Sequence, residues 1–139
     1  MAAKDKYHEL VRSALEADGW TITNDPFYIR PEKGVNYPID LTAERVLVAE
    51  KGTEKIAVEI KSFLQESTLY EFHQAIGQYL DYQTGLEMLN SAYELILAIP
   101  EPVFQYLWSF ETIRRSAQKV NMKVLVYKLE IPEIALWIR

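Results

Sequence analysis

Hydrophobic positions near the start of the chain recur at the spacing of an amphipathic helix. They follow the i, i+3, i+4, i+7, i+8 pattern of a single helical face: Tyr7, Leu10, Val11, Ala14 and Leu15. Asp5 is expected to cap this helix and Gly19 to end it. His8 and Glu9 lie on its polar side. His8 is about 100° round the helix from Tyr7, so it can reach a neighbouring site.

The hydrophobic period changes to two after Gly19, which predicts strands. Residues 20–23 and 27–30 form two short strands, with a turn at 24–26 between them and a second turn at 31–34. An apolar alternation follows, in which Tyr37, Ile39 and Leu41 alternate with Pro38, Asp40 and Thr42. Asp40 is therefore predicted on the polar face of an apolar strand.

A second charged strand lies at residues 55–63. Its alternation places Ile56, Val58 and Ile60 on one face and Ala57, Glu59 and Lys61 on the other. The strand rise separates Glu59 from Lys61 by roughly 6 to 7 Å, a gap across which a metal-bound phosphate can touch both. A Gly-containing turn at 51–54 joins this strand to segment 43–50 as a hairpin, which completes an antiparallel meander.

The second half of the chain alternates helices and strands. Thr68 and Glu71 have capping-box spacing at the start of a long helix that continues towards Leu89. Residues 93–99 are nearly continuously apolar, and they are expected to form a strand that pairs parallel to the Glu59 strand, because a helix connects the two. Three further elements are then expected: a helix from Pro102 through Ile113, and strands at 122–127 and 134–138.

Polar side chains form a column on the long helix. Gln74, Gln78 and Tyr82 fall at i, i+4 and i+8, so they share one face. Amides at this spacing either face solvent or orient water or nucleic acid, and both interpretations stay open.

Composition narrows the class of protein. With 139 residues, 49% hydrophobic and 25% charged, the chain fits one globular domain. Its net charge of −5 argues against a broad basic nucleic-acid surface. A local basic cluster is either a solvated helix face or a phosphate clamp: Arg114, Arg115, Lys119 and Lys123. The absence of cysteine excludes thiolate chemistry. No signal peptide or membrane span is recognisable, so a cytoplasmic location is expected.

The order of these elements, with Pro-Ile-Asp followed by Val-Glu-Ile-Lys, resembles the core of the PD-(D/E)XK nuclease superfamily. The expected fold is therefore an α/β chain with an α+β mixed sheet and a restriction-endonuclease-like core. A more specific resemblance runs along nearly the whole chain through K-D-K-Y-H, L-E-A-D-G-W-T-I-T, I-D-L-T-A-E-R, K-I-A-V-E-I-K-S-F, F-H-Q-A-I-G-Q-Y and A-L-W-I. These motifs resemble the XisH-like fdxN-element excision controlling factor family of cyanobacteria. The family pattern has His at the position of Asn24 and Gly at that of Thr42.

The resemblances imply a site and partners. Asp40 and Glu59 would hold Mg²⁺ or Mn²⁺ together with the Ile60 carbonyl, and Lys61 would act on the attacking water and the developing charge. Gln74, Gln78, Tyr82, His8 and Glu9 are candidates for support. The implied partners are DNA, a site-specific recombinase and an XisI-like controlling factor.

Several alternatives remain open. The chain is either a metal-dependent endonuclease or an inactive accessory protein that binds DNA or a partner protein through the same fold. Glu-x-Lys also occurs by chance, so Glu59 and Lys61 can form a plain structural ion pair. Glu50 competes with Asp40 for the place of the first acidic ligand. Four aromatic residues are too many to bury with certainty, and some of them can form a homodimer interface: Tyr70, Tyr79, Tyr82 and Trp108.

Overall fold

The computed structural model describes residues 3–47, 52–64 and 66–139. It is a mixed α/β fold with four helices and eight strands in these residues. In chain order the elements are α1 (Ala3–Ala17), β1 (Thr21–Asn24), β2 (Phe27–Glu32), β3 (Val35–Ile39), β4 (Leu41–Leu47), β5 (Gly52–Ile60), α2 (Thr68–Met88), β6 (Glu94–Pro100), α3 (Glu101–Leu107), α4 (Glu111–Lys119), β7 (Val124–Tyr127) and β8 (Ile134–Ile138).

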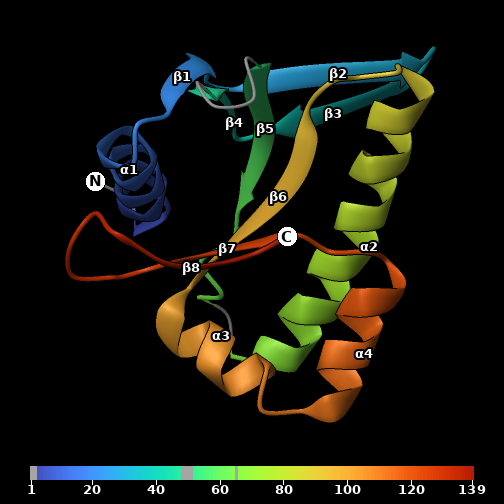
Figure 1. Ribbon diagram of the computed structural model, residues 1–139. Helices are drawn as coiled ribbons and strands as arrows, with labels where there is room; N and C mark the ends of the chain where they lie inside the picture. The colour runs from blue at the N-terminus through green and yellow to red at the C-terminus, as the bar shows by residue number, and fades with distance from the viewer. Residues whose placement is uncertain (1–2, 48–51, 65) are drawn as a thin grey trace.

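Six strands form one mixed sheet in the order β1-β4-β5-β6-β7-β8. The pairs β5–β6 and β6–β7 are parallel, and the outer pairs are antiparallel. The parallel pairing of residues 93–99 with the Glu59 strand is thus confirmed. Helix α1 covers one face of the sheet, and α2 and α4 cover the other (Figure 1).

The alternation of β5 divides the core into two clusters. Ile56 and Val58 are fully buried in the cluster that contains Val11 and Leu15 of α1. Ala57, on the opposite face, is buried in the cluster formed with α2, α3 and α4. The predicted faces of this strand are confirmed, and both faces are covered by helices.

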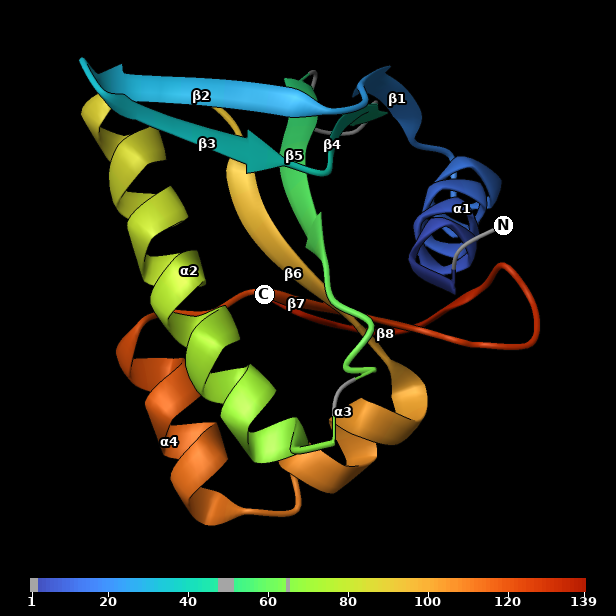
Figure 2. The ribbon, with the colours of Figure 1, turned by 180° about the vertical axis from the view of Figure 1, so that it is seen from behind.

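The predicted single meander is wrong in one respect. Strands β2 and β3 pair only with each other and form a separate two-stranded ribbon, with Tyr28 opposite Pro38. Figure 2 shows this ribbon crossing one end of the molecule towards the end of α2. The chain changes from the ribbon to the main sheet at Asp40, because Ile39 ends β3 and Leu41 begins β4. Asp40 therefore lies at a junction and not within a strand.

Four local predictions also need correction. Helix α1 begins at Ala3, so Asp5 does not cap it, whereas Gly19 does follow its end with a φ of 94°. Ser67, not Thr68, caps α2 by accepting a hydrogen bond from the Tyr70 N–H at 3.2 Å.

Residues 52–54 belong to β5, so the predicted turn there is wrong, and Lys51 lies outside the described residues. The helix expected from Pro102 through Ile113 is two helices, because α3 ends at Leu107 and α4 begins at Glu111.

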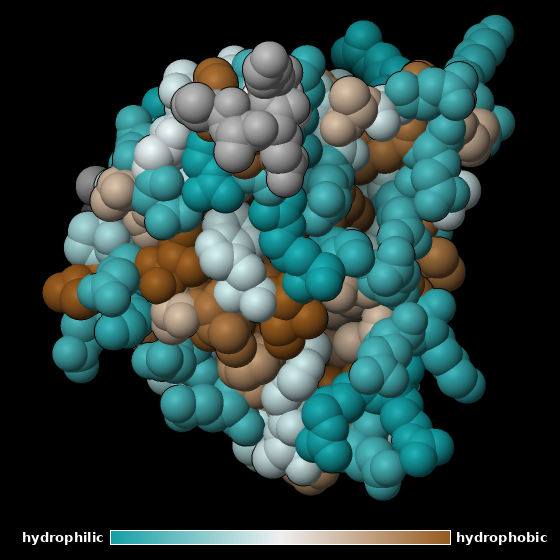
Figure 3. Space-filling view, viewed as in Figure 1, coloured by the Kyte–Doolittle hydropathy of each residue, from teal (hydrophilic) through white to brown (hydrophobic). Residues whose placement is uncertain are grey.

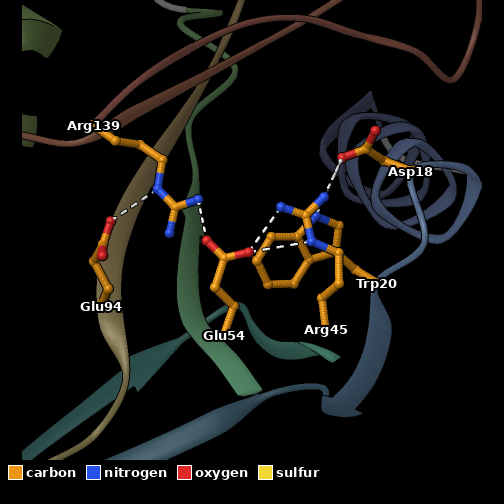
Figure 4. Close-up of polar contacts among 6 residues, drawn as sticks. All are labelled: Asp18, Trp20, Arg45, Glu54, Glu94 and Arg139. Carbon is orange, nitrogen blue, oxygen red and sulfur yellow. Dashed lines mark hydrogen bonds and ion pairs between the residues drawn. The ribbon is translucent and has the colours of Figure 1, made fainter. Parts of the chain in front are cut away.

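A chain of ion pairs connects strands at the end of the sheet away from Asp40 (Figure 4). Arg45 of β4 contacts Asp18 at 3.3 Å and Glu54 of β5 at 2.8 Å. Arg139 contacts Glu54 and, at 3.2 Å, Glu94 of β6. Burial alone would raise the pKa of Glu54, but its hydrogen bonds from Arg45 and Arg139 prevail and lower it. This network joins three neighbouring strands to the end of the described chain.

Candidate functional site

Asp40 is held against the end of β5 by a backbone hydrogen bond. The Ile60 N–H donates to Asp40 Oδ2 at 2.7 Å. In an extended strand the N–H and C=O of one residue point to the same side, so the Ile60 carbonyl is directed to the side on which Asp40 lies. The junction between the ribbon and the main sheet thus places a carboxylate and a carbonyl at one strand end.

Glu59 and Lys61 meet Asp40 at this strand end. The Lys61 Nζ lies 3.4 Å from Glu59 Oε2, and the Glu59 side chain is only 12% exposed. Glu59 Oε1 is buried and accepts no hydrogen bond from the described residues. The three residues predicted from Pro-Ile-Asp and Glu-Ile-Lys therefore come together in space.

The surroundings of Glu59 favour its protonated form. Burial is the largest cause, the negative charge of Asp40 is the next, and together they raise the pKa of Glu59 to about 8 although Lys61 acts in the opposite direction. In the absence of a cation, the pair of acids therefore favours a proton on Glu59. A divalent cation between the two acids would replace that proton, because it supplies the positive charge that the pair lacks.

The main chain at Lys61 is fixed by the neighbouring strands. The Lys61 N–H donates to the Ala98 carbonyl of β6 at 2.9 Å, and the Tyr127 hydroxyl donates to the Lys61 carbonyl at 3.1 Å. Burial raises the pKa of Tyr127 well above its usual range, so the hydroxyl stays a donor. Sequence reasoning missed Tyr127. Its only sequence signal is a hydroxyl at the end of an otherwise apolar strand.

A cavity of about 280 Å³ between α1, the end of β5 and α2 is lined by Asp40, Glu59, Ile60 and Lys61. Its remaining walls come from Tyr7, His8, Ser62, Phe63, Glu71 and Gln74. Phe63 adopts a positive φ of 57°, an uncommon conformation for a residue with a side chain.

The candidates for support divide into two groups. His8 lies in the cavity wall and is oriented by Asp25, whose Oδ2 is 2.8 Å from His8 Nε2 and 2.7 Å from Arg12 Nη1. Gln74 also lies in the wall. Glu9 is exposed and contributes nothing to the lining.

Gln78 and Tyr82 form a second polar layer beside the two acids. Gln78 Nε2 donates to the Tyr82 hydroxyl at 3.0 Å, and neither residue lines the cavity. Tyr82 is buried, with its ring centroid 4.9 Å from that of Tyr37. Burial, followed by the charge of Glu59, raises the pKa of Tyr82 to about 12. Tyr82 and Tyr79 are therefore buried in the core of the chain. Trp108 is half-buried and Tyr70 is exposed.

The oxygen atoms in this site suit a hard cation that takes only a few of its ligands from the protein. Within residues 3–47, 52–64 and 66–139, no group of three or more histidine, aspartate or glutamate side chains is placed to hold a metal ion. Two of the three carboxylates in the cavity wall, those of Asp40 and Glu59, lie together at the end of β5, where the Ile60 carbonyl is the third oxygen donor. Mg²⁺ is commonly bound by one or two carboxylates and keeps several waters, and the unpartnered Glu59 Oε1 offers it an oxygen. Glu50 lies outside the described residues.

Comparison with known proteins decides the family. The family model described as XisH protein matches residues 1–135. The chain belongs to the XisH family. A crystal structure of an XisH family protein from Nostoc punctiforme is 38% identical, with a TM-score of 0.86, and the match covers 97% of this chain and 100% of that one. A comparison with curated proteins finds no match.

A second XisH-like structure carries a functional description. The crystal structure of an fdxN element excision controlling factor protein from Anabaena variabilis is also 38% identical with a TM-score of 0.86, and the match covers 97% of this chain and 99% of that one. None of the helices described for this XisH-family chain has the length and apolarity needed to cross a membrane.

Proposed function

We propose that this chain takes part in controlling the excision of a DNA element and does so as a divalent-cation-dependent phosphodiesterase. The observation that carries the proposal is the convergence of Asp40, Glu59 and Lys61 in one cavity at the end of β5. The name of the Anabaena relative supports the role in excision.

The strand arrangement supports the nuclease interpretation. An antiparallel set, β1-β4-β5, is followed by α2 and by the parallel strand β6, in the order of the PD-(D/E)XK core that the sequence resembles. The first acid precedes β4 and the second lies near the end of β5, so the antiparallel pairing of these strands presents both acids at the same end of the sheet.

In this proposal Asp40, Glu59 and the Ile60 carbonyl would hold Mg²⁺ or Mn²⁺. The cation would polarise the phosphate and acidify a bound water. Lys61 has two tasks: its ammonium, 3.4 Å from Glu59, favours the deprotonated carboxylate, and it can stabilise negative charge on a phosphate oxygen. Tyr127 holds the Lys61 main chain for both tasks.

A second candidate function is that of a non-catalytic accessory protein that binds DNA, a recombinase or an XisI-like controlling factor. The observation in its favour is that Asp40 and Lys61 both have partners within the chain, in the Ile60 N–H and Glu59. The net charge of −5 also disfavours extensive contact with DNA.

A cleavage assay separates the two candidates. Wild type with Mg²⁺ or Mn²⁺ is expected to cut duplex or branched DNA, and Lys61→Met should lose about 10²-fold or more of that rate, because it lacks the charge that stabilises the transition state. Lys55→Met is the matched control, since Lys55 lies on the same strand, outside the cavity, and pairs with Glu44 at 3.4 Å. DNA binding without cleavage would favour the accessory function, and equal rates for both variants would contradict the site.

A further inference from the structure

The outer edge of β8 is open in the described residues. The strand has a hydrogen-bonded neighbour, β7, on one side only. The opposite edge of the sheet, β1, is shorter and mostly polar, with the sequence Thr-Ile-Thr-Asn. The two edges of the sheet therefore differ in their capacity to accept another strand.

The β8 edge is apolar along its whole length. Every residue of Ile134–Ile138 is apolar and at least partly exposed, and Leu136 in the middle is 45% exposed. Ile131, in the preceding turn, is 47% exposed. Hydrophobic atoms gather near the centre of the face seen in Figure 3, where Figure 1 draws β8.

Natural edge strands are usually protected by lysine, proline, bulges or a covering element. The β8 strand has no lysine or proline, and its pairing with β7 has a single irregularity, at the step from Leu136 to Ile134. Strands β6 and β7, which have a neighbouring strand on both sides, are buried in their centres, whereas β8 is not. Such an edge is suited to a partner strand.

The charges at the two ends of β8 indicate which strand would pair with its open edge. Glu133 precedes the strand, pairs with Lys128 at 3.4 Å and keeps a side chain that is 54% exposed. Arg139 follows the strand, pairs with Glu54 and Glu94 and keeps a side chain that is 29% exposed. When two copies of one strand pair antiparallel, the start of each lies against the end of the other. Glu133 of one copy would then lie near Arg139 of the second copy at both ends, whereas parallel pairing would place like charges together.

We propose that β8 pairs antiparallel with β8 of a second copy of this chain across a two-fold axis near Leu136. The two six-stranded sheets then form one continuous sheet, and the apolar edges cover each other. Because the β1 edge is short and polar, pairing stops at two copies. This interface is separate from the cavity, so the proposed dimer does not depend on the proposed hydrolytic function.

Sedimentation of wild type and two variants tests the proposal. Wild type is expected to be a concentration-dependent dimer, and Leu136→Lys a monomer, because two lysine charges would then face each other near the axis. Leu80→Lys is the matched control. It changes the same residue type at a similar exposure, 47%, on α2, and it should remain dimeric. A monomeric wild type, larger open-ended assemblies, or a dimer that survives Leu136→Lys would each overturn the proposal.

Cross-linking tests the register in the folded protein. The chain has no cysteine, so Leu136→Cys introduces a unique thiol. Near a two-fold axis the two thiols lie within disulfide reach, and mild oxidation should give a covalent dimer at least about tenfold faster than in Leu80→Cys, since pairing raises the effective concentration. Equal rates in the two variants would contradict pairing through β8. A monomeric wild type would contradict the dimer and would indicate that a strand from another protein pairs with β8.

Discussion

Glu59 is the residue whose chemical state depends most on its surroundings. It lies beside a second carboxyl, Asp40, and has one cation, Lys61, at 3.4 Å. One oxygen of its carboxylate has no hydrogen-bond donor among the described residues. A buried carboxylate pair of this kind stores unfavourable electrostatic energy, which a proton or a cation relieves.

The raised pKa of Glu59 predicts an unusual pH dependence of stability in the absence of metal. The folded-state pKa of about 8 exceeds the unfolded value of 4.5, so the folded protein binds the proton more tightly. The stabilisation is complete below pH 4.5, declines by up to about 1.4 kcal/mol per pH unit, and is lost once the pH passes about 8. Glu59→Gln has no such group, so its melting temperature should rise relative to wild type between pH 5 and pH 9.

Thermal unfolding in the presence of a chelator checks this expectation. Glu9→Gln is the control, because Glu9 is exposed on α1 outside the cavity, and its melting temperature should follow wild type at every pH. A constant difference between Glu59→Gln and wild type across this range would show that Glu59 is not buried beside a second charge.

At the scale of elements, α2 connects the main sheet to the β2–β3 ribbon. Phe72 near its start and Tyr79 in its middle are buried in the core between α2 and the sheet. Near its end, Gly85 lies against the ribbon, and a Cβ placed there would be 2.9 Å from Pro31 Cγ and 3.2 Å from Ile29 Cδ1. Gly77, two turns earlier, has nothing within 4 Å of the equivalent position.

These two glycines give opposite predictions for the same substitution. Gly77→Ala should stabilise the protein by about 0.5–1 kcal/mol, because alanine restricts the unfolded chain and favours the helix. Gly85→Ala should destabilise it by about 1–3 kcal/mol, because the rigid proline ring cannot yield without moving the ribbon. Urea unfolding of both variants measures the difference. A stabilising Gly85→Ala would show that the ribbon does not pack closely on α2.

Some of these elements were predictable and others were not, for local reasons. The strict alternation of Ile56 to Lys61 identifies the faces of β5, and the helix between two apolar runs predicts their parallel pairing. The break at Asp40 leaves no such mark, because Ile39 and Leu41 continue the alternation across it. Only the distant partners, β2 for one side and β1 with β5 for the other, divide the segment into two strands.

The candidate site residues were likewise predictable from the sequence only in part. Asp40, Glu59 and Lys61 could be chosen from sequence because their charges interrupt apolar strands. The column of Gln74, Gln78 and Tyr82 was also visible, but helical spacing alone does not show that Gln74 lines the cavity while the hydrogen-bonded pair of Gln78 and Tyr82 does not. Tyr127 could not be found, because its contact with Lys61 joins residues 66 positions apart.

At the scale of the whole molecule, two distant parts of the sheet have different tasks. The end near Asp40 collects the groups that could act on a phosphate. The other end is tied by the ion pairs of Arg45, Glu54 and Arg139, which join β4, β5 and β6. Asp40 directly precedes β4 and Glu59 is the next-to-last residue of β5, so the relative placement of the two acids depends on how these two strands are held together.

The most direct test of the central claim is calorimetric titration of the protein with Mn²⁺ at pH 8. Wild type should bind the ion at one site, and Asp40→Asn and Glu59→Gln, which keep side-chain volume and a hydrogen-bond acceptor, should both lose it. Glu44→Gln, on β4 but outside the cavity, should bind as wild type does. Unchanged binding in the two cavity variants, or no binding by folded wild type at millimolar Mn²⁺, would contradict a cation site shared by Asp40 and Glu59.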